Sequence, residues 1–329
     1  MRDALVVGGT RFLGRHTVED LLEHDYRVTL FNRGEHANPF AGTDGVHHYE
    51  GDRTNDRALL TAKREVEPDV VLDFAAYQPR DVRQATEIFA DCEAYVYVSS
   101  GAVYAREDVP KREDRTPLRD CSADQAADDT RETYGNRKAE GDRMVFRAAE
   151  RGAPAMAVRP TVVYGPHDYT ERLDYWLHRI TEHDRVVVPG DGTNLWQRVY
   201  VEDVASACRV VAEDGTPGEA YNVGDVNART LDDTVRDAAE ALDTDVEIVH
   251  ASDRELATGG LSCADFPLYR RAPHLLDTRK LEALGWTSTP VEEAMAATAA
   301  EHRESDRTGA SEGPAREDEE TVLAVLDTV

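Results

Sequence analysis

The chain has 329 residues, of which 40% are hydrophobic and 31% are charged, and its formal net charge is −27 at pH 7. This composition is too apolar for a disordered chain. The acidity argues against nucleic-acid binding, which needs a basic surface to displace counterions from phosphates. No apolar run approaches the ~18–20 residues that a membrane-spanning helix needs, so we expect no membrane partner.

Lysine is scarce in this acidic chain. Nearly every fixed positive charge is an arginine, and the only lysines are Lys63, Lys111, Lys138 and Lys280. Acid-rich, lysine-poor surfaces suit concentrated salt, where screening shortens the reach of charge repulsion. We therefore expect a halophilic protein. A GC-rich genome that favours arginine codons is the alternative explanation.

The cysteines suggest neither a metal site nor a redox pair. They are spread along the chain without CxxC spacing or a nearby histidine cluster, at Cys92, Cys121, Cys208 and Cys263. Reduced thiols without a bound metal are the expectation. An expected strand begins at residue 4 with no leader peptide before it, so we expect a cytoplasmic protein.

Short apolar runs alternate with helical patterns in the first half of the chain. The expected strands are 4–7, 27–31, 46–49, 70–74 and 94–99. The expected helices are 14–24, 57–65, 82–89 and 132–151. Strands and helices that alternate at this spacing predict βαβ units, and hence a doubly wound parallel α/β sheet of the Rossmann type.

The second half predicts a return to this sheet and a smaller C-terminal substrate-binding lobe. A polar stretch at 105–130 is expected to form a surface loop or lid. The expected dinucleotide-binding domain spans 1–165, with 199–226 returning to it, and the substrate lobe comprises 166–198 and 227–300. Residues 301–329 show mostly charge with Gly, Ser and Pro, which predicts an acidic, disordered tail with a short helix at 321–326.

A glycine-rich segment follows the first strand and opens the first helix. It reads Val7-Gly8-Gly9-Thr10-Arg11-Phe12-Leu13-Gly14. Glycines in this context permit a tight turn, a close approach to a pyrophosphate and close packing of the helix, whose N-terminus favours an anion. The segment 8–14 therefore predicts a dinucleotide site, although an ordinary strand–helix turn would look similar.

The end of the second strand bears on the choice of cofactor. An acid there would bind the adenosine ribose of NAD, but the sequence has Asn32 followed by Arg33. Arg33 can pair with a 2′-phosphate, with Arg11 in reach of the same region, so we favour NADP over NAD. Asp52, after the third strand, is a candidate acceptor for the adenine amine. A solvated turn arginine and a turn-forming aspartate are the alternatives.

Tyr134 and Lys138 lie four residues apart and so share one face of an expected helix. A tyrosine has a pKa near ~10, and a neighbouring ammonium lowers that pKa by favouring the phenolate. Such a pair can exchange a proton with a substrate hydroxyl during hydride transfer. Ser100, at the end of the fifth strand, is expected to bind the substrate oxygen, although it can equally close a turn. A surface helix pair is the alternative for Tyr134 and Lys138.

With these motifs in this order, residues 1–300 resemble the extended short-chain dehydrogenase/reductases, the NAD(P)-dependent epimerase/dehydratase group. Residues 73–77 correspond to the family's His-x-Ala-Ala segment, and the motifs at 159–166, 189–192, 199–205 and 220–224 also match. The resemblance implies a catalytic triad of Ser100, Tyr134 and Lys138. It also implies cofactor contacts at Ala75, Ala76, Tyr134 and Lys138. A homodimer is implied by this resemblance alone.

Departures from the family pattern leave the substrate open. Arg11 replaces a glycine, which resembles an atypical branch that includes plant chloroplast stem-loop-binding proteins. Gly101 and Ala102 stand where dehydratases carry an Asp-Glu pair, so 4,6-dehydration is disfavoured. Trp196 stands where many epimerases have a diphosphate-binding arginine. The candidate substrate contacts are Tyr164, Arg198, Arg270 and Arg271, and surface positions are the alternative for Arg270 and Arg271.

Two functions remain open at this point. One is an NAD(P)-dependent epimerase or reductase that acts on a sugar nucleotide or a related small secondary alcohol or ketone. The other is a non-catalytic NAD(P)-binding regulatory or RNA-associated protein of the atypical branch. The intact Ser100, Tyr134 and Lys138 favour the enzyme, and the net charge of −27 disfavours RNA.

Overall fold

The computed structural model describes residues 2–328, which form two compact units. Unit 1 consists of residues 2–163, Val201–Gly224 and Leu276–Thr287. Unit 2 consists of Tyr164–Tyr200, Asp225–Leu275 and residues 288–328. The α/β fold class is confirmed. The segment Leu276–Thr287, which we expected in the substrate lobe, belongs to unit 1 instead.

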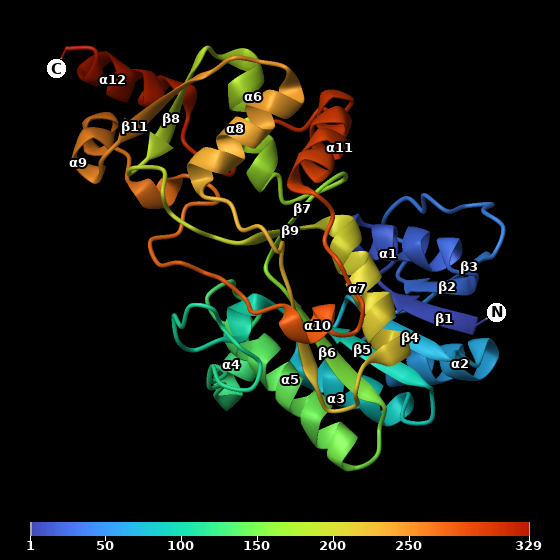
Figure 1. Ribbon diagram of the computed structural model, residues 1–329. Helices are drawn as coiled ribbons and strands as arrows, with labels where there is room; N and C mark the ends of the chain where they lie inside the picture. Colours follow the sequence, from blue (N-terminus) through green and yellow to red (C-terminus); the bar gives the residue numbers. More distant parts are fainter. Residues whose placement is uncertain (1, 329) are drawn as a thin grey trace. The chain divides into compact units, whose positions relative to one another are not determined.

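Unit 1 is built on a seven-stranded parallel sheet with the strand order β10-β6-β5-β4-β1-β2-β3 (Figure 1). The strands are β1 (Arg2–Val7), β2 (Tyr26–Asn32), β3 (Val46–Glu50), β4 (Val70–Asp73), β5 (Ala94–Val98), β6 (Ala155–Pro160) and β10 (Ala220–Val223). The strand order reverses between β1 and β4, and ligands of such sheets bind beyond the carboxyl ends of the strands at this point.

Helices cover both faces of this sheet. They are α1 (Phe12–Glu23), α2 (Asp56–Val66), α3 (Pro79–Ile88), α5 (Tyr134–Glu150) and α7 (Val201–Asp214). Buried side chains of α2, α3 and α5 form one core with Leu5 and Val71 of the sheet, while α1 and α7 pack together on the other face (Figure 1). Helix α5 begins at Tyr134, so its first turn lies near the carboxyl ends of the strands.

The longest connection within residues 2–163 is the polar stretch that we expected to be a loop. That stretch follows the 3₁₀ turn Gly101–Val103 and contains one short helix, α4 (Ala123–Ala127). An isolated bridge between Tyr104 and Leu118 folds its first part back on itself. Helix α10 (Arg279–Glu282) completes the unit after the last crossover.

Unit 2 combines a two-stranded parallel sheet with several helices. The sheet pairs β8 (Arg185–Pro189) with β11 (Glu247–Ala251). The main helices are α6 (Arg172–Glu182), α8 (Leu231–Leu242), α11 (Val291–Arg303) and α12 (Arg316–Leu326). Helix α8 packs against both α6 and α11. Strand β9 (Arg198–Tyr200) and the short helix α9 (Asp253–Leu256) complete this unit, and β7 (Val162–Tyr164) leads into it.

The expected disordered tail at 301–329 is wrong for its described part, because residues 301–328 pack onto α6. Glu319 of α12 is 1% exposed and accepts a hydrogen bond from Arg179 Nε at 2.9 Å and another from the Tyr175 hydroxyl. Arg179 also donates to the carbonyl of Pro314 at 2.7 Å. The composition suggested disorder because the elements that α12 packs against, α9 and the 3₁₀ turn Ala257–Gly259, lie elsewhere in the sequence.

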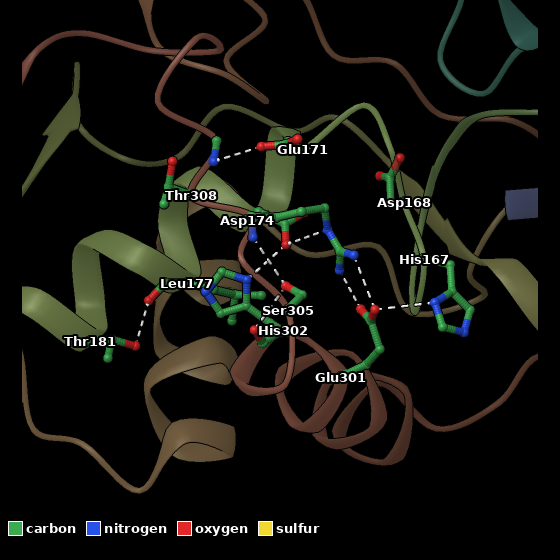
Figure 2. A network of polar contacts seen from close by, with 12 residues as sticks. His167, Asp168, Glu171, Asp174, Leu177, Thr181, Glu301, His302, Ser305 and Thr308 are labelled. Carbon is green, nitrogen blue, oxygen red and sulfur yellow. Dashed lines mark hydrogen bonds and ion pairs between the residues drawn. The ribbon is translucent and has the colours of Figure 1, made fainter. Parts of the chain in front are cut away.

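A second set of polar contacts, drawn in Figure 2, joins the end of α11 to α6. Asp174 of α6 contacts His302 Nδ1 at 2.7 Å and accepts from Arg307 Nε at 3.2 Å. Glu301 pairs with Arg307 and, at 3.1 Å, with His167 Nδ1. Asp174, buried on α6, and Glu301, half-buried near the end of α11, therefore both have basic partners. No helix within residues 2–328 has the length and apolar character that a bilayer crossing requires.

These contacts predict that Glu319→Ala destabilises the protein by about 3–5 kcal/mol, because the Arg179 guanidinium would be left buried without its carboxylate. The matched control is Glu320→Ala, which breaks only the exposed ion pair with Arg316 at 3.3 Å and should change the free energy of unfolding by less than about 1 kcal/mol. Denaturant unfolding of both variants measures the difference. Equal stabilities would show that the C-terminal segment contributes little.

Candidate active site and cofactor loop

The glycine-rich loop between β1 and α1 is tightly built. Gly8 has φ +96°, a conformation that favours glycine, and its N–H donates to the Phe31 carbonyl at 3.1 Å. A Cβ on Gly14 would collide with the Gly8 carbonyl oxygen, and one on Gly9 would lie 2.6 Å from Leu30 Cδ2. Both positions therefore require glycine for helix α1 to begin directly against the loop.

The start of α1 is suited to an anion. Its first turn contains no acidic residue, and the side chain of the N-cap residue, Arg11, makes no capping hydrogen bond. In a chain with 65 acidic residues, an acid-free first turn leaves the positive end of the helix dipole available to a phosphate. Thr10 and Leu13 are half-buried and Phe12 is buried. This loop fits the pyrophosphate of a dinucleotide.

Ala75 and Ala76 follow β4 and lie beside this loop. A Cβ on Gly8 would be 3.5 Å from Ala75 Cβ, so the two segments approach each other closely. The Ala76 carbonyl oxygen accepts a hydrogen bond from Lys138 Nζ at 3.0 Å. The end of β4 thus connects the glycine loop to helix α5.

Lys138 is 3% exposed and lies inside unit 1. Its ammonium donates to the carbonyls of Ala76 at 3.0 Å and Val98 at 2.8 Å, at the ends of β4 and β5. Nζ also lies 4.8 Å, 5.1 Å and 5.9 Å from the ring centroids of Tyr97, Tyr77 and Tyr134. Burial lowers the pKa of Lys138 to about 8, against the opposing attraction of Asp73 and Asp142. The structure therefore brings Lys138 next to Tyr134.

Ser100 belongs to a turn that packs against the start of α5. Its Oγ accepts from the Ala102 N–H at 3.2 Å and caps the 3₁₀ turn. A Cβ on Gly135 would lie 2.5 Å from the Ala102 carbonyl oxygen. The glycine after Tyr134 therefore lets the helix approach the Ser100 turn. All three residues of the expected triad come from segments that meet at the carboxyl end of the sheet.

The end of β2 differs from the sequence expectation in one respect. The parallel register pairs Asn32 with Glu50 at the end of β3, and a Cβ on Gly34 would lie 3.3 Å from the Glu50 carboxyl carbon. Arg33 is exposed and pairs with Glu35 at 2.9 Å. An acid therefore lies beside the expected ribose region although none follows β2 directly in the sequence.

Asp52 and Asn32 already have local partners. Asp52 Oδ1 accepts from both the N–H and the hydroxyl of Thr54 at 2.8 Å, and these hydrogen bonds lower the pKa of Asp52. Asn32 Oδ1 accepts from Gly34 N–H at 2.8 Å, whereas its Nδ2 is buried without a hydrogen-bond partner in the described structure. The free Asn32 amide is the stronger candidate for a cofactor contact.

Two of the candidate substrate residues are enclosed within unit 2. Arg198 is buried, with donors to the carbonyls of Arg229 and Thr230 at 3.2 and 3.3 Å, and burial lowers its pKa. Tyr164 is also buried, with its ring 5.9 Å from that of Tyr200. The cavity beside them has a volume of about 10 Å³, which is room for one water molecule.

The other two substrate candidates are more accessible. Arg270 is half-buried and lies 5.6 Å over the ring of Trp196, and Arg271 is exposed. Trp196 stands where the family pattern has an arginine. In this chain its ring contacts the guanidinium of another arginine of unit 2, Arg270.

Sequence reasoning missed a buried ion pair between Arg53 and Asp73. Arg53 Nη2 donates to Asp73 Oδ2 at 2.5 Å, the Tyr95 hydroxyl donates to the same oxygen at 3.0 Å, and Asp81 lies 3.4 Å from Arg53 Nη1. An aspartate that ends a wholly apolar strand was the available signal. Its partner could not be identified because Arg53 lies 20 residues earlier.

The fold and this constellation define an α/β dinucleotide-binding protein with a Ser, Tyr and Lys set at the carboxyl end of its sheet. Residues 4–224 match the model of the NAD dependent epimerase/dehydratase family. The chain belongs to this family.

Individual relatives are distant. The chain is 27% identical over 78% of its length to the chloroplast stem-loop binding protein of 41 kDa b of Arabidopsis thaliana, covering 67% of that protein. It is also 27% identical to the low-salt glycan biosynthesis protein Agl12 of Haloferax volcanii, with 86% and 93% of the two chains covered.

The fold of the whole chain is shared with solved enzymes. The UDP-glucose 4-epimerase of Thermus thermophilus, solved with NAD, superposes with a TM-score of 0.70 over 92% of this chain and 99% of that one, at 22% identity. Trifunctional plant enzymes with a 4,6-dehydratase activity also match, and this chain spans about half of their length.

The packing of the loop predicts that Gly14→Ala weakens NAD(P)H binding at least about tenfold, because the added Cβ forces the loop and α1 apart. Calorimetric titration of the folded variant with NADH and NADPH measures this effect. The control is Gly42→Asn, at a position with φ +82° and open space around the Cβ, which should bind as the wild type does. Unchanged affinity in Gly14→Ala would place the cofactor elsewhere.

Proposed function

We propose that this protein is an NAD(P)-dependent epimerase or reductase that acts on a sugar nucleotide or a related secondary alcohol or ketone, with Tyr134 as acid/base. The observation that carries the proposal is the buried ammonium of Lys138, held by two carbonyls at 2.8 and 3.0 Å within 5.9 Å of the Tyr134 ring. A surface helix pair would not bury a lysine in this way.

In this mechanism Tyr134 transfers the proton of the reacting hydroxyl or carbonyl. The neighbouring ammonium favours the phenolate form, which an acid/base tyrosine must reach during proton transfer. Ser100 donates a hydrogen bond to the same substrate oxygen and orients it toward Tyr134. The rigid turn that Ser100 caps supports this role, because a preorganised donor need not reorganise during the reaction.

The cofactor would supply hydride acceptance and return when it is bound. The loop at Gly8–Gly14 and the start of α1 would hold its pyrophosphate, and Ala75 and Ala76 would line the adjacent ribose. Lys138 has three N–H donors, of which Ala76 and Val98 use two. The third would bind a ribose hydroxyl.

The residues after Ser100 support the reaction class, and the names of relatives support the substrate class. Gly101 and Ala102 have no side chain that could move the protons of a water elimination, so epimerisation or reduction is favoured over 4,6-dehydration. The names of the matched relatives include both a UDP-glucose epimerase and a glycan biosynthesis protein. These names support a sugar nucleotide as the substrate class, bound in part by Arg270 or Arg271.

Removal of the Tyr134 hydroxyl is expected to lower turnover by about 10²–10⁴-fold, the usual contribution of a positioned acid/base. Cofactor affinity should change less than twofold, because the ring and Lys138 remain. The assay supplies UDP-glucose, UDP-galactose and UDP-glucuronate with either nicotinamide cofactor. Tyr49→Phe is the matched control. The Tyr49 ring stacks on Phe31, with the two ring centroids 5.8 Å apart, and is not one of the rings around Lys138.

Wild-type turnover in Tyr134→Phe would contradict the assignment. A wild type that turns over none of these substrates but binds a stem-loop RNA would favour the second candidate, a non-catalytic NAD(P)-binding protein that associates with RNA. The plant relative's name, which describes a stem-loop binding protein, is the reason to include this test. Mass spectrometry of small molecules released from the purified protein separates the two enzymatic variants. Retained NAD(H) indicates an epimerase, and an empty site that binds NADPH indicates a reductase.

For the cofactor, we propose that Arg33 favours NADP and that Glu35 limits this preference. The guanidinium can pair with a 2′-phosphate, but it is paired with Glu35 at 2.9 Å, and Glu50 adds a second negative charge nearby. Carboxylates near the phosphate would repel it.

The expected result is that Arg33→Gln weakens NADPH binding about tenfold, as loss of a charged phosphate contact does. Glu35→Gln should strengthen NADPH binding, and neither variant should alter NADH binding. Titration of both cofactors against both variants measures this. Equal NADPH affinity of Arg33→Gln and the wild type would remove Arg33 from the cofactor site.

A further inference from the structure

The Asp73 carboxylate, at the carboxyl end of the sheet, accepts hydrogen bonds at both of its oxygens. It is 1% exposed at the end of β4. Oδ2 accepts from Arg53 Nη2 at 2.5 Å and from the Tyr95 hydroxyl at 3.0 Å. Oδ1 accepts from the backbone N–H of Ala75 at 3.0 Å. One oxygen therefore serves the ion pair and the other serves the backbone that leaves the strand.

The backbone that leaves β4 also supports Lys138. The Ala75 N–H donates to Asp73 and so fixes the turn after β4. The carbonyl of the following residue, Ala76, accepts from Lys138 Nζ at 3.0 Å. The second carbonyl on Nζ, from Val98, belongs to the neighbouring strand β5. A change in the Asp73 turn therefore moves one of the two oxygens that position the ammonium.

The Lys138 ammonium has no directly contacting anion, so more distant charges act on it. No carboxylate among residues 2–328 contacts Nζ, whose neighbours are two carbonyls and the rings of Tyr77, Tyr97 and Tyr134.

The charged groups that act on Lys138 from nearby elements have partners of their own. They are Asp73 of β4, Asp142 of α5, Arg53 after β3 and Arg137 of α5. Asp142 is bound by Arg159 at 2.8 Å. Burial lowers the pKa of Lys138 to about 8, and Asp73 opposes this effect more than any other group.

We propose that Asp73 is a positioning residue that holds the Lys138 ammonium in place through the turn at Ala75 and Ala76 and stabilises its positive charge. This inference rests on the proposed role of Lys138 beside Tyr134. The resemblance places a histidine at this position in the wider family, where this chain has the carboxylate of Asp73. Arg53 Nη2 donates to Asp73 Oδ2 at 2.5 Å in the interior, and Asp73 in turn provides the opposite charge that favours a buried ammonium.

The expected sign follows from the charges. Loss of the Asp73 charge lowers the pKa of Lys138 further, because an opposite charge no longer favours the ammonium. Lys138 would then lose its proton at a lower pH than in the wild type, and the alkaline limb of any activity that needs the ammonium would move to lower pH. The expected displacement in Asp73→Asn is about one pH unit.

The scarcity of lysine makes a direct test practical. Protein labelled with ¹³C at the lysine ε-carbon gives signals from four side chains only, and the signal missing in Lys138→Met identifies Lys138. Titration of the protein without added cofactor then reports the pKa of Lys138 in each variant. This readout needs neither substrate nor turnover.

Three variants separate a charge effect from a structural one. Asp73→Asn should titrate about one pH unit below the wild type. The double variant Asp73→Asn, Arg53→Gln removes both charges, buries no unpaired charge, and should titrate between the two, because Arg53 itself lowers the pKa of Lys138 less than Asp73 raises it. Tyr95→Phe keeps the carboxylate and loses only one hydrogen bond. It should unfold more easily yet titrate as the wild type does.

A Lys138 that titrates at the same pH in the wild type and the double variant would overturn the proposal, and so would an equal displacement in Tyr95→Phe. If Asp73→Asn does not fold, the double variant and Tyr95→Phe decide the matter alone. Failure of the proposed function is distinguishable, because an inactive protein would still show the displacement of the lysine signal.

Discussion

Unit 1 holds charged side chains in its core that are neutralised in pairs, above all in the Arg53–Asp73 ion pair at 2.5 Å. A buried ion pair with a missing partner costs several kcal/mol, whereas a complete and hydrogen-bonded one is tolerated. Tyr95 and the Ala75 N–H complete the hydrogen bonds of the carboxylate. This pair ties the segment after β3, which carries Asp52, to the turn after β4, from which Ala76 holds Lys138. The segment that carries Asp52 and the carbonyl that holds Lys138 therefore share one electrostatic support.

Buried arginine pairs recur elsewhere in the molecule. Arg159 donates to Asp142 at 2.8 Å and to the Tyr104 hydroxyl at 2.9 Å in unit 1, and Arg179 donates to Glu319 in unit 2. The planar guanidinium suits these sites because its fixed donors satisfy several acceptors together. Arginine thus serves inside this protein as well as on its acidic surface.

The four lysines have another property in common. Each donates to a backbone carbonyl: Lys63 to Ile88 at 2.7 Å, Lys111 to Asp108 at 3.4 Å, Lys280 to Ala220 at 2.9 Å, and Lys138 to Ala76 and Val98. The few lysines of this chain therefore share a contact with the backbone, and the scarcity of lysine does not by itself indicate a catalytic role for any one of them. What sets Lys138 apart is its burial among tyrosine rings, with no carboxylate of residues 2–328 in contact. That distinction rests on three-dimensional surroundings.

By itself, the amino-acid sequence determined the parallel α/β sheet, the loop at Gly8–Gly14 and the pairing of Tyr134 with Lys138, because periodicity, glycine spacing and an i,i+4 separation are local properties. Only the tertiary structure revealed that Asp73 pairs with Arg53, that Glu50 lies opposite Asn32, that Arg198 is buried, and that the C-terminal segment packs onto α6. Each of these depends on strand register or on contacts between distant segments. Composition does not show whether a charged side chain faces solvent or contacts a buried partner of opposite charge.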